Sequence, residues 1–303
     1  MEQHVLQTPR PSPSPVRLLN SIIRMKHPIY PCLWFNNQAL EAAFWYTEVF
    51  GNGKVTETNP MVTIFELFGS KIMALNGGPA FSPNPSISFY IDCASESEVE
   101  HYYNQLMEGG SALMPLGSYP WSPKYGWLQD KYGTNWQFFV GQSPVATTQL
   151  SPQLMFTQAQ AGKAKQAIEF YTSLFPGSKV HALVHYEPGD GDAVENIKHA
   201  SFSLGPTLFK AMDSSHAHQF TFNEGISLVV ECDTQGEIDK YWKALTQNGE
   251  EQMCGWLKDQ FGVSWQIVPA ILGDLMNDRK KSQKVAAAFM QMKKMDIKKL
   301  LDA

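Results

Sequence analysis

The sequence has few cysteines, and they follow no metal-binding pattern. Its four cysteines, Cys32, Cys93, Cys232 and Cys254, lie far apart, without a Cys-x-x-Cys pair or histidines at ligand spacing. Neither a structural zinc site nor a disulfide framework is therefore indicated. Scattered thiols are typical of a reducing compartment, so we expect a cytoplasmic protein.

A strong charge of one sign and long apolar runs are also lacking. Lysine and arginine number 24 against 29 aspartates and glutamates, which gives a net charge of −5 for 303 residues. Because general nucleic-acid binders carry a basic excess, we expect no nucleic-acid partner. The longest apolar run near the start, residues 18–23, is broken by Asn20 and Ser21 and is too short for a signal core or a membrane span. We therefore expect no membrane partner either.

Proline, by contrast, is concentrated at the start of the chain. Pro9, Pro11, Pro13 and Pro15 alternate with polar residues, a pattern that favours an extended segment over a packed one. Residues 1–27 are therefore predicted to be a mobile tail outside the fold.

One stretch of sequence occurs twice. Residues 254–269, CGWLKDQFGVSWQIVP, match residues 125–140, YGWLQDKYGTNWQFFV, and each reads as a strand, a tight turn and a second strand. Asp130 and Asp259 begin the turns, and a glycine three residues on can supply the positive φ that closes each of them. Side chains alternate across a strand, so Gln137 and Gln266 point to the face opposite their neighbouring tryptophans. These amides either bond to nearby backbone or line a pocket.

The elements around the first copy have a repeating order. A strand at 29–35, a helix at 40–50 and strands at 54–58, 62–68 and 71–76 are followed by a strand at 87–92 and a helix at 96–107. A loop rich in proline and aromatics, 111–124, then leads into the 125–140 hairpin. Strand, helix and further strands thus occur in the same order twice.

The whole arrangement returns in the second half. WYTEVFGNGKV at 45–55 matches FYTSLFPGSKV at 170–180, and ISFYIDC at 87–93 matches ISLVVEC at 226–232. These matches predict one duplicated domain, at 28–141 and 151–270, with a linker at 142–150. Residues 271–303 are predicted to form a helical tail. Its apolar residues Val285, Phe289 and Met292 share one helical face, which either packs on the fold or serves as a membrane or partner surface.

Four strand-helix-strand-strand-strand units, each pair closed by a D-x-x-G-x-x-W-Q hairpin, resemble two fused domains of the glyoxalase/bleomycin-resistance/extradiol-dioxygenase superfamily, also called vicinal oxygen chelate. The motifs LNGGP at 75–79 and CGWL at 254–257, and the ending MQMKKMDIKKL at 290–300, are similar to its PhnB-like branch, which is often labelled demethylubiquinone methyltransferase-like. The resemblance implies an α+β fold. Paired units would form curved mixed sheets around a cleft, with helices on the outer faces.

The resemblance also implies where a metal would bind. Superfamily enzymes hold a divalent metal in the cleft with ligands from the first and last strands of each unit. The corresponding positions are Tyr30, Ala74, Ser86 and Gln137 in the first domain and Ser151, Ala211, Gly225 and Gln266 in the second. One neutral amide per cleft cannot repay the dehydration of such a cation. We therefore expect no metal at these positions and no cofactor, and the eight histidines, His181, His185 and His199 among them, do not supply an obvious alternative site.

A cleft without a metal still suits a small molecule. Tyr30, Cys32 and Trp34 share one face of the first strand, and Ser151, Gln153 and Met155 share the matching face in the second domain. Such walls fit a largely apolar molecule with one or two polar groups; packing in the core is the alternative for Trp34 and Met155. The candidate ligand-binding residues are Tyr30, Cys32, Trp34, Asn76, Trp121, Gln137, Gln153, Asp213, Trp256 and Gln266.

Three functions are consistent with these features. The first is a small-molecule-binding protein that uses a cleft without the usual metal. The second is an enzyme, either a lyase or isomerase of glyoxalase type or the methyltransferase of the family label, although the sequence has no glycine-rich loop suited to adenosylmethionine. The third is a structural fusion in which one domain serves as the partner of the other. Neither a catalytic residue nor the oligomeric state follows from the sequence, and a homo-oligomer stays open.

We expect the ligand in the first domain's cleft. Its glycine-rich turn at 76–79 lets backbone approach closely, and the 111–124 loop can lay Tyr119 and Trp121 over an opening. The corresponding segment of the second domain is shorter. Cys254 is either a nucleophile or a buried structural thiol.

Overall fold

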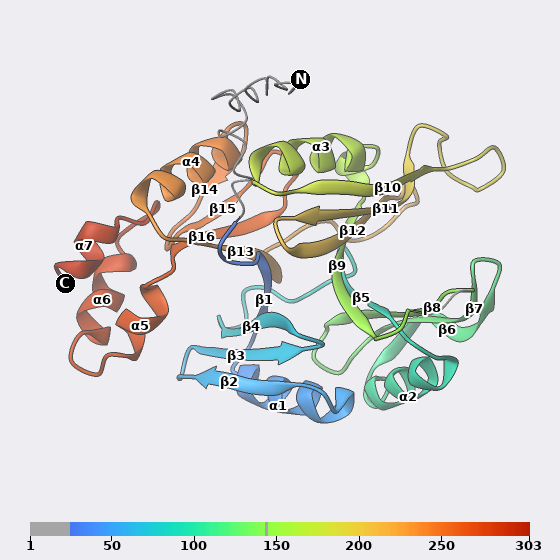
Figure 1. Ribbon diagram of the computed structural model, residues 1–303, viewed down its shortest axis with the longest axis horizontal. Helices are drawn as coiled ribbons and strands as arrows, with labels where there is room; N and C mark the ends of the chain where they lie inside the picture. The colour runs from blue at the N-terminus through green and yellow to red at the C-terminus, as the bar shows by residue number, and fades with distance from the viewer. Residues whose placement is uncertain (1–24, 143–144) are drawn as a thin grey trace, which may run out of the picture.

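The computed structural model describes residues 25–142 and 145–303. They form two eight-stranded sheets with helices against them (Figure 1). The predicted mobile tail, 1–27, lies almost wholly outside the described residues. Its last two residues are bound, because Lys26 Nζ and His27 Nε2 each lie about 3 Å from Asp233. None of the helices in the described part of the chain is long and apolar enough to cross a membrane.

Four units of the order β-α-β-β-β make up the two sheets. The first consists of β1 (Tyr30–Phe35), α1 (Ala39–Phe50), β2 (Lys54–Thr58), β3 (Val62–Leu67) and β4 (Ser70–Asn76). The second consists of β5 (Ile87–Asp92), α2 (Glu96–Leu106), β6 (Ser111–Tyr119), β7 (Ser122–Gln129) and β8 (Asn135–Val140). The third consists of β9 (Gln149–Phe156), a 3-10 turn (Gln158–Gln160), α3 (Ala164–Leu174), β10 (Lys179–His185), β11 (Ile197–Leu204) and β12 (Thr207–Asp213). The fourth consists of β13 (Ile226–Cys232), α4 (Gln235–Thr246), β14 (Glu250–Glu251), β15 (Trp256–Lys258) and β16 (Ser264–Pro269), and the tail adds α5 (Leu272–Asn277), α6 (Ser282–Phe289) and α7 (Ile297–Leu301).

One segment differs from the prediction in its secondary structure. Residues 111–124, expected to be a loop, form most of the long β6–β7 hairpin, with Tyr119 paired to Ser122 next to its tip. The fourth unit has only the two-residue strand β14 at the corresponding place. The second unit therefore carries a projecting hairpin that the fourth unit lacks.

The pairing of units also differs from the prediction. We expected each domain to close a cleft from its own two units, and this is wrong. Sheet A joins units 1 and 4, because β1 runs antiparallel to β13 with Tyr30 opposite Val229, and sheet B joins units 2 and 3, because β5 runs antiparallel to β9 with Ser88 opposite Gln153. Each sheet therefore draws one unit from each half of the chain.

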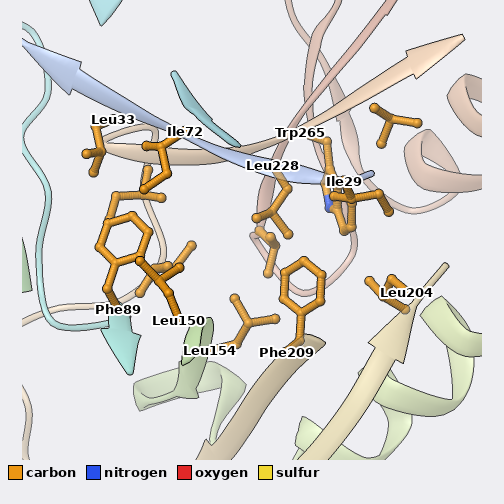
Figure 2. Packing of buried hydrophobic residues seen from close by; sticks show 14 of the residues in the cluster. Ile29, Leu33, Ile72, Phe89, Leu150, Leu154, Leu204, Phe209, Leu228 and Trp265 are labelled. Carbon is orange, nitrogen blue, oxygen red and sulfur yellow. The ribbon is translucent and has the colours of Figure 1, made fainter. Parts of the chain in front are cut away.

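The two sheets share one hydrophobic core. Strand alternation gives each sheet a face lined with apolar side chains, and the helices pack on that same face. Figure 2 shows Leu33 and Leu228 of sheet A together with Phe89, Leu154 and Phe209 of sheet B in this core. We call the opposite face of each sheet, on which none of the helices α1 to α4 packs, its free face. Trp265 and Ile267 are both buried in the core, and Gln266 lies between them on the same strand. This alternation explains why the duplicated hairpin places an amide on a free face.

The predicted helical tail packs on the fourth unit. Val285 is buried, Phe289 and Met292 lie against the same core, and the backbone N–H of Cys254 donates to the carbonyl of Met292 at 2.7 Å. The apolar stripe of the tail is therefore used for packing. Leu272, at the start of α5, lies against the free face of sheet A.

Candidate functional site

The free face of sheet B gathers polar side chains that are almost completely buried. Ser88 and Tyr90 come from β5, Ser151 and Gln153 from β9, and Gln137 from β8. Register places Ser88 opposite Gln153 and Tyr90 opposite Ser151, while Gln137 lies beside Tyr90 on the neighbouring strand. These five side chains therefore form one continuous patch.

Gln137 is fixed at both ends of its amide. Its Nε2 donates to Ser88 Oγ at 2.9 Å, and its Oε1 accepts from the Tyr125 hydroxyl at 2.7 Å. Gln266 repeats the first of these bonds on sheet A, where its Nε2 donates to Ser227 Oγ at 2.9 Å. Both amides therefore bond to side chains of their own free face rather than to backbone.

Unpartnered polar atoms concentrate on sheet B. Ser151, which is fully buried, has no partner for Oγ, and Gln153, only 3% exposed, has none for Oε1. The indole Nε1 of Trp127 and Oδ1 of Asn135 are likewise buried without a partner in the described chain, whereas sheet A has one such atom, Ser264 Oγ. A buried polar atom left unpaired costs about 1–3 kcal/mol, so a water or ligand that pairs with these atoms would stabilise the protein.

A buried ion pair lies next to these atoms. Lys210 of β12 is the register neighbour of Gln153, and its Nζ reaches Asp92 Oδ2 at 2.8 Å while passing 3.9 Å from the centre of the Tyr90 ring. Burial lowers the pKa of Lys210, and Asp92 opposes that shift. His199 lies on the adjoining strand β11, and burial together with Lys210 lowers its pKa to about 4, so its imidazole is neutral at pH 7.

Aromatic side chains extend this face along the β6–β7 hairpin. The rings of Tyr119 and Trp121 stack with centroids 5.0 Å apart, and both meet Tyr125 edge-on. Since Tyr125 donates to Gln137, the aromatic cluster is continuous with the polar patch. Trp121 is 51% exposed, which leaves part of its ring open to solvent.

On the free face of sheet A, the charged and phenolic groups pair with one another. The Tyr30 hydroxyl donates to Glu231 Oε1 at 2.6 Å, and Lys71 Nζ binds the same carboxylate oxygen at 2.7 Å. Cys32 is buried between these strands, and burial raises the pKa of its thiol to about 12. Leu272 of α5 covers part of this apolar floor.

Trp34 and Trp256 pack against each other at one end of sheet A. Their ring centroids are 5.8 Å apart, and the indole of Trp34 donates to the carbonyl of Gly78 at 2.8 Å. A Cβ on Gly77 would lie 2.1 Å from the Trp34 ring, so the glycine in this turn makes room for the chain's own tryptophan. The close approach that we expected for a ligand is thus used by Trp34.

Asn76 and Asp213, both candidate ligand-binding residues, hold the starts of helices and do not lie on a free face. The side-chain oxygen of Asn76 accepts from the backbone N–H of Ala39, the first residue of α1, at 2.9 Å. Asp213 accepts three backbone N–H groups, from Gly162, Ala164 and Ile197. Their proposed binding role is therefore not supported by their positions.

The candidate residues thus divide between two places. Sheet A carries Tyr30, Cys32, Trp34, Trp256 and Gln266, whereas sheet B carries Gln137 and Gln153, with Trp121 at its hairpin. Four candidates of the predicted first domain are separated, because Trp34 and Asn76 belong to sheet A, Gln137 belongs to sheet B and Trp121 lies at the β6–β7 hairpin of sheet B. Cys254 is half-buried, and burial raises the pKa of its thiol, which suits a structural role.

The residues at the inherited metal positions do not fit a divalent metal. Ala74 and Ala211 are buried in the core, facing away from both free faces, and Gln137 already uses both ends of its amide. Residues 25–142 and 145–303 contain no cluster of three or more His, Cys, Asp or Glu side chains placed to hold a metal. The side chains at these inherited positions include no carboxylate and no imidazole, so they do not supply the ligand set that zinc or a related cation requires.

Comparison with known protein families assigns the chain to a family. A family model described as 3-demethylubiquinone-9 3-methyltransferase matches residues 27–139 and again residues 148–268. The chain belongs to this family. Its two matches correspond to the two halves of the duplicated sequence.

Several solved structures are similar to this chain. The PhnB protein of Bacillus cereus is 33% identical over 39% of this chain and 100% of its own, with a TM-score of 0.35. Glyoxalase I of Zea mays, 12% identical over 84% of this chain and 96% of its own, has a TM-score of 0.54 and supports the tandem glyoxalase-like fold. Comparison with curated proteins gives no match.

Several residues of the sheet B patch escaped the sequence analysis. Ser88, Tyr90, Asp92 and Lys210 were not among the candidates, nor was Trp127. Strand parity could have found the first three, because they alternate with the core residues Ile87, Phe89 and Ile91 on one strand. Lys210 stands within the apolar run LFKAM, where a charged residue is itself a signal.

Proposed function

We propose that this family member binds a small organic molecule, without a metal, on the free face of sheet B. The observation that carries the proposal is the set of buried polar atoms without partners, Ser151 Oγ, Gln153 Oε1 and Trp127 Nε1. On sheet A, by contrast, the chain's own charged groups and Leu272 occupy the equivalent face. A binding site commonly combines apolar walls with a few converging polar groups, which is the composition found on sheet B.

The Gln153→Leu variant tests the proposal. Leucine fits a similar volume and removes an unpaired polar atom, so the free energy of unfolding should stay the same or rise by up to about 1 kcal/mol. Ligand binding should be lost. A metabolite screen by thermal shift would find the ligand, and calorimetric titration of the wild type and the variant would measure its affinity.

Two matched variants serve as controls. Gln137→Leu removes an amide that is bonded at both ends, so it should lower the free energy of unfolding by about 1–3 kcal/mol. Gln266→Leu makes the equivalent change on sheet A and should leave binding intact. Binding that survives Gln153→Leu and is lost in Gln266→Leu would assign the ligand to sheet A and refute the proposal.

The enzymatic alternatives have a separate readout. Stoichiometric zinc, nickel, iron or manganese in the purified protein would favour a lyase or isomerase of glyoxalase type, and methyl transfer to a quinol would support the activity in the family's description. The four unpaired cysteines support a reducing compartment, and we propose the cytoplasm on that ground.

A further inference from the structure

A hollow of about 540 Å³ opens where the first unit meets the second, beside the helices α1 and α2 (Figure 1). None of the residues around it belongs to the polar patch of sheet B, so this place is separate from the proposed binding site. Its lining comes from the loop after α1, the β3–β4 turn, the first half of α2 and the residues ahead of β9, namely Asn52, Phe68, Gly69, Ala94, Glu98, Tyr102 and residues 146–148.

The third and fourth units form an equivalent place, because the chain is duplicated. YPCLWF at 30–35 corresponds to SPQLMF at 151–156, and both segments form the first strand of their half. Residues 25–27, ahead of β1, therefore correspond to residues 146–148, ahead of β9. The two places can thus be compared residue by residue.

At the third and fourth units, the chain's own residues fill this place. Met25 packs against the turn residue Gly205, because a Cβ added to the glycine would lie 3.0 Å from the Cβ and Sδ atoms of Met25. Lys26 Nζ and His27 Nε2 lie 3.1 and 3.0 Å from Asp233 Oδ1. This place therefore accommodates an apolar side chain with basic groups next to it.

At the first and second units, the corresponding residues leave the place open. Ala146 stands at the position of Met25 and lacks the Cγ, Sδ and Cε atoms of methionine. Threonines at 147 and 148 stand at the positions of the two basic residues. The first half of the duplication therefore supplies neither the apolar side chain nor the positive charge.

Phe68 has an unfavourable backbone conformation at the edge of the hollow. Its φ is +50°, in the left-handed region that favours glycine, and the equivalent residue of the third unit is Gly205, with φ +55°. The Phe68 ring packs on Phe50, with centroids 5.3 Å apart, and meets Tyr102 edge-on at 6.1 Å. An aromatic side chain at a position where the duplicate has glycine favours a role as the wall of a site.

The hollow carries a negative charge that no lining residue balances. Glu98 is the only Asp, Glu, Lys, Arg or His among the lining residues. Its Oε2 accepts from the backbone N–H of Ala94 and from the Thr148 hydroxyl, whereas its Oε1 has no hydrogen-bond partner within residues 25–142 and 145–303. A partly buried carboxylate beside apolar rings attracts a cation and repels an anion.

We propose that this hollow binds a small organic cation, a primary amine on a short apolar chain. The ammonium group lies at Glu98 Oε1. The apolar chain lies against Phe68 and Tyr102, in the space that a methionine fills at the equivalent place, and the two rings add cation–π attraction.

Pentylamine, 1-pentanol and pentanoate are matched probes, because they share a chain and differ in charge. Ligand-observed NMR titrations at pH 7 with the full chain should give pentylamine a Kd of about 1–10 mM. The Kd of 1-pentanol should be at least about threefold higher, and that of pentanoate at least about tenfold higher, because the carboxylate of Glu98 repels an anion.

Three variants separate the contributions of space, charge and wall. Ala146→Met copies the residue of the equivalent place into the hollow and should weaken pentylamine at least about tenfold. Glu98→Gln keeps an acceptor at the start of α2 and removes the charge, so pentylamine should bind no better than 1-pentanol. Phe68→Gly should weaken pentylamine and 1-pentanol alike, at least about threefold, because it removes apolar surface and leaves the charge.

The duplication also supplies the control. Glu237→Gln makes in α4 the change that Glu98→Gln makes in α2, and it should leave the Kd of pentylamine unchanged. Circular dichroism checks that each variant folds, and Ala146 is exposed, so its substitution by methionine leaves the core intact.

Three results would overturn the proposal. Pentanoate that binds as tightly as pentylamine would refute the ligand class. Pentylamine binding that survives both Ala146→Met and Glu98→Gln would refute the site. The absence of saturable pentylamine binding up to about 50 mM would refute both.

Discussion

Asp130 and Asp259 tie neighbouring units together through single buried carboxylates. Asp130 of the second unit accepts from the Tyr46 hydroxyl of α1 at 2.8 Å and from the indole of Trp136 at 2.8 Å. Asp259 does the same with Tyr171 of α3 and Trp265. Each also accepts two backbone N–H groups of its own turn, which explains why an aspartate begins both hairpins.

These carboxylates should make stability depend on pH. Burial raises the pKa of Asp130 and Asp259 from 3.8 to about 6. Between these values the folded state holds more protons than the unfolded state, so their contribution is complete below about pH 4 and is lost as pH rises through 6. Between pH 7 and pH 5 this contribution to the free energy of unfolding should therefore increase.

The Asp259→Asn variant measures the effect. In the variant, the asparagine NH2 group replaces an oxygen that accepts hydrogen bonds, and it faces groups that are themselves donors. At pH 7 the free energy of unfolding should therefore fall by about 2–4 kcal/mol. When the pH is lowered from 7 to 5, the free energy of unfolding should also increase less in the variant than in the wild type. Urea denaturation at both pH values gives the comparison, with exposed Asp274→Asn as control. An unchanged pH dependence would mean that Asp259 does not titrate in this range.

At the scale of elements, the strand-to-helix connections depend on a residue at the end of β4 and of β12. Asp213, fully buried, holds three backbone N–H groups, and Asn76 holds one while donating to the carbonyl of Pro60. The two residues occupy equivalent places in the duplicated domain. They therefore stabilise the entries to α1 and α3.

Removal of these side chains should affect stability and not binding. Asp213→Ala leaves three donors unpaired and should lower the free energy of unfolding by about 2–4 kcal/mol, whereas Asn76→Ala should cost about 1–2 kcal/mol. Chemical denaturation measures the stability of each variant, and titration with the ligand found in the screen measures its binding. Loss of ligand binding in folded Asp213→Ala would return Asp213 to the list of binding residues.

Elements were predictable where local patterns decide them. The helices, the duplicated hairpins and the faces of Gln137 and Gln266 follow from period and parity, and the structure has them. The β6–β7 hairpin was missed because Pro115 and Pro120 suggested a loop. Since β6 is the edge strand of sheet B, with irregular register, it tolerates a proline that a central strand would not.

At the scale of the whole molecule, sequence could not choose which units share a sheet. Core and free-face side chains alternate along β1 and β5 in the same way whether each strand pairs with a strand of its own half of the chain or of the other half. The choice therefore depends on three-dimensional packing, which no local pattern records. For this reason the sequence analysis grouped Trp34 and Gln137 around one cleft, whereas the two residues belong to different sheets.

The exchanged pairing predicts how the molecule responds to cleavage. With a protease site inserted between Val140 and Gln149, the cut halves should elute together in size exclusion under native conditions, because both sheets and the core cross the cut. Either half expressed alone should not be monomeric, since the central strand of each unit lacks its partner. Halves that separate after cleavage as stable monomers would contradict the arrangement of the sheets.

The same pairing has a consequence for the nascent chain on the ribosome. Tyr30 of β1 is paired with Val229, about 200 residues later, and at about 5–20 residues per second that partner follows some 10 to 40 s after it. Until then the inner edge of β1 presents unpaired backbone groups to solvent. The central strands of sheet B, β5 and β9, lie much closer in the chain, so sheet B can form first. Unit 1 can then pack on sheet B before unit 4 has been synthesised. The order of synthesis thus allows sheet B to form before sheet A, and it makes premature termination between the two halves a route to aggregation.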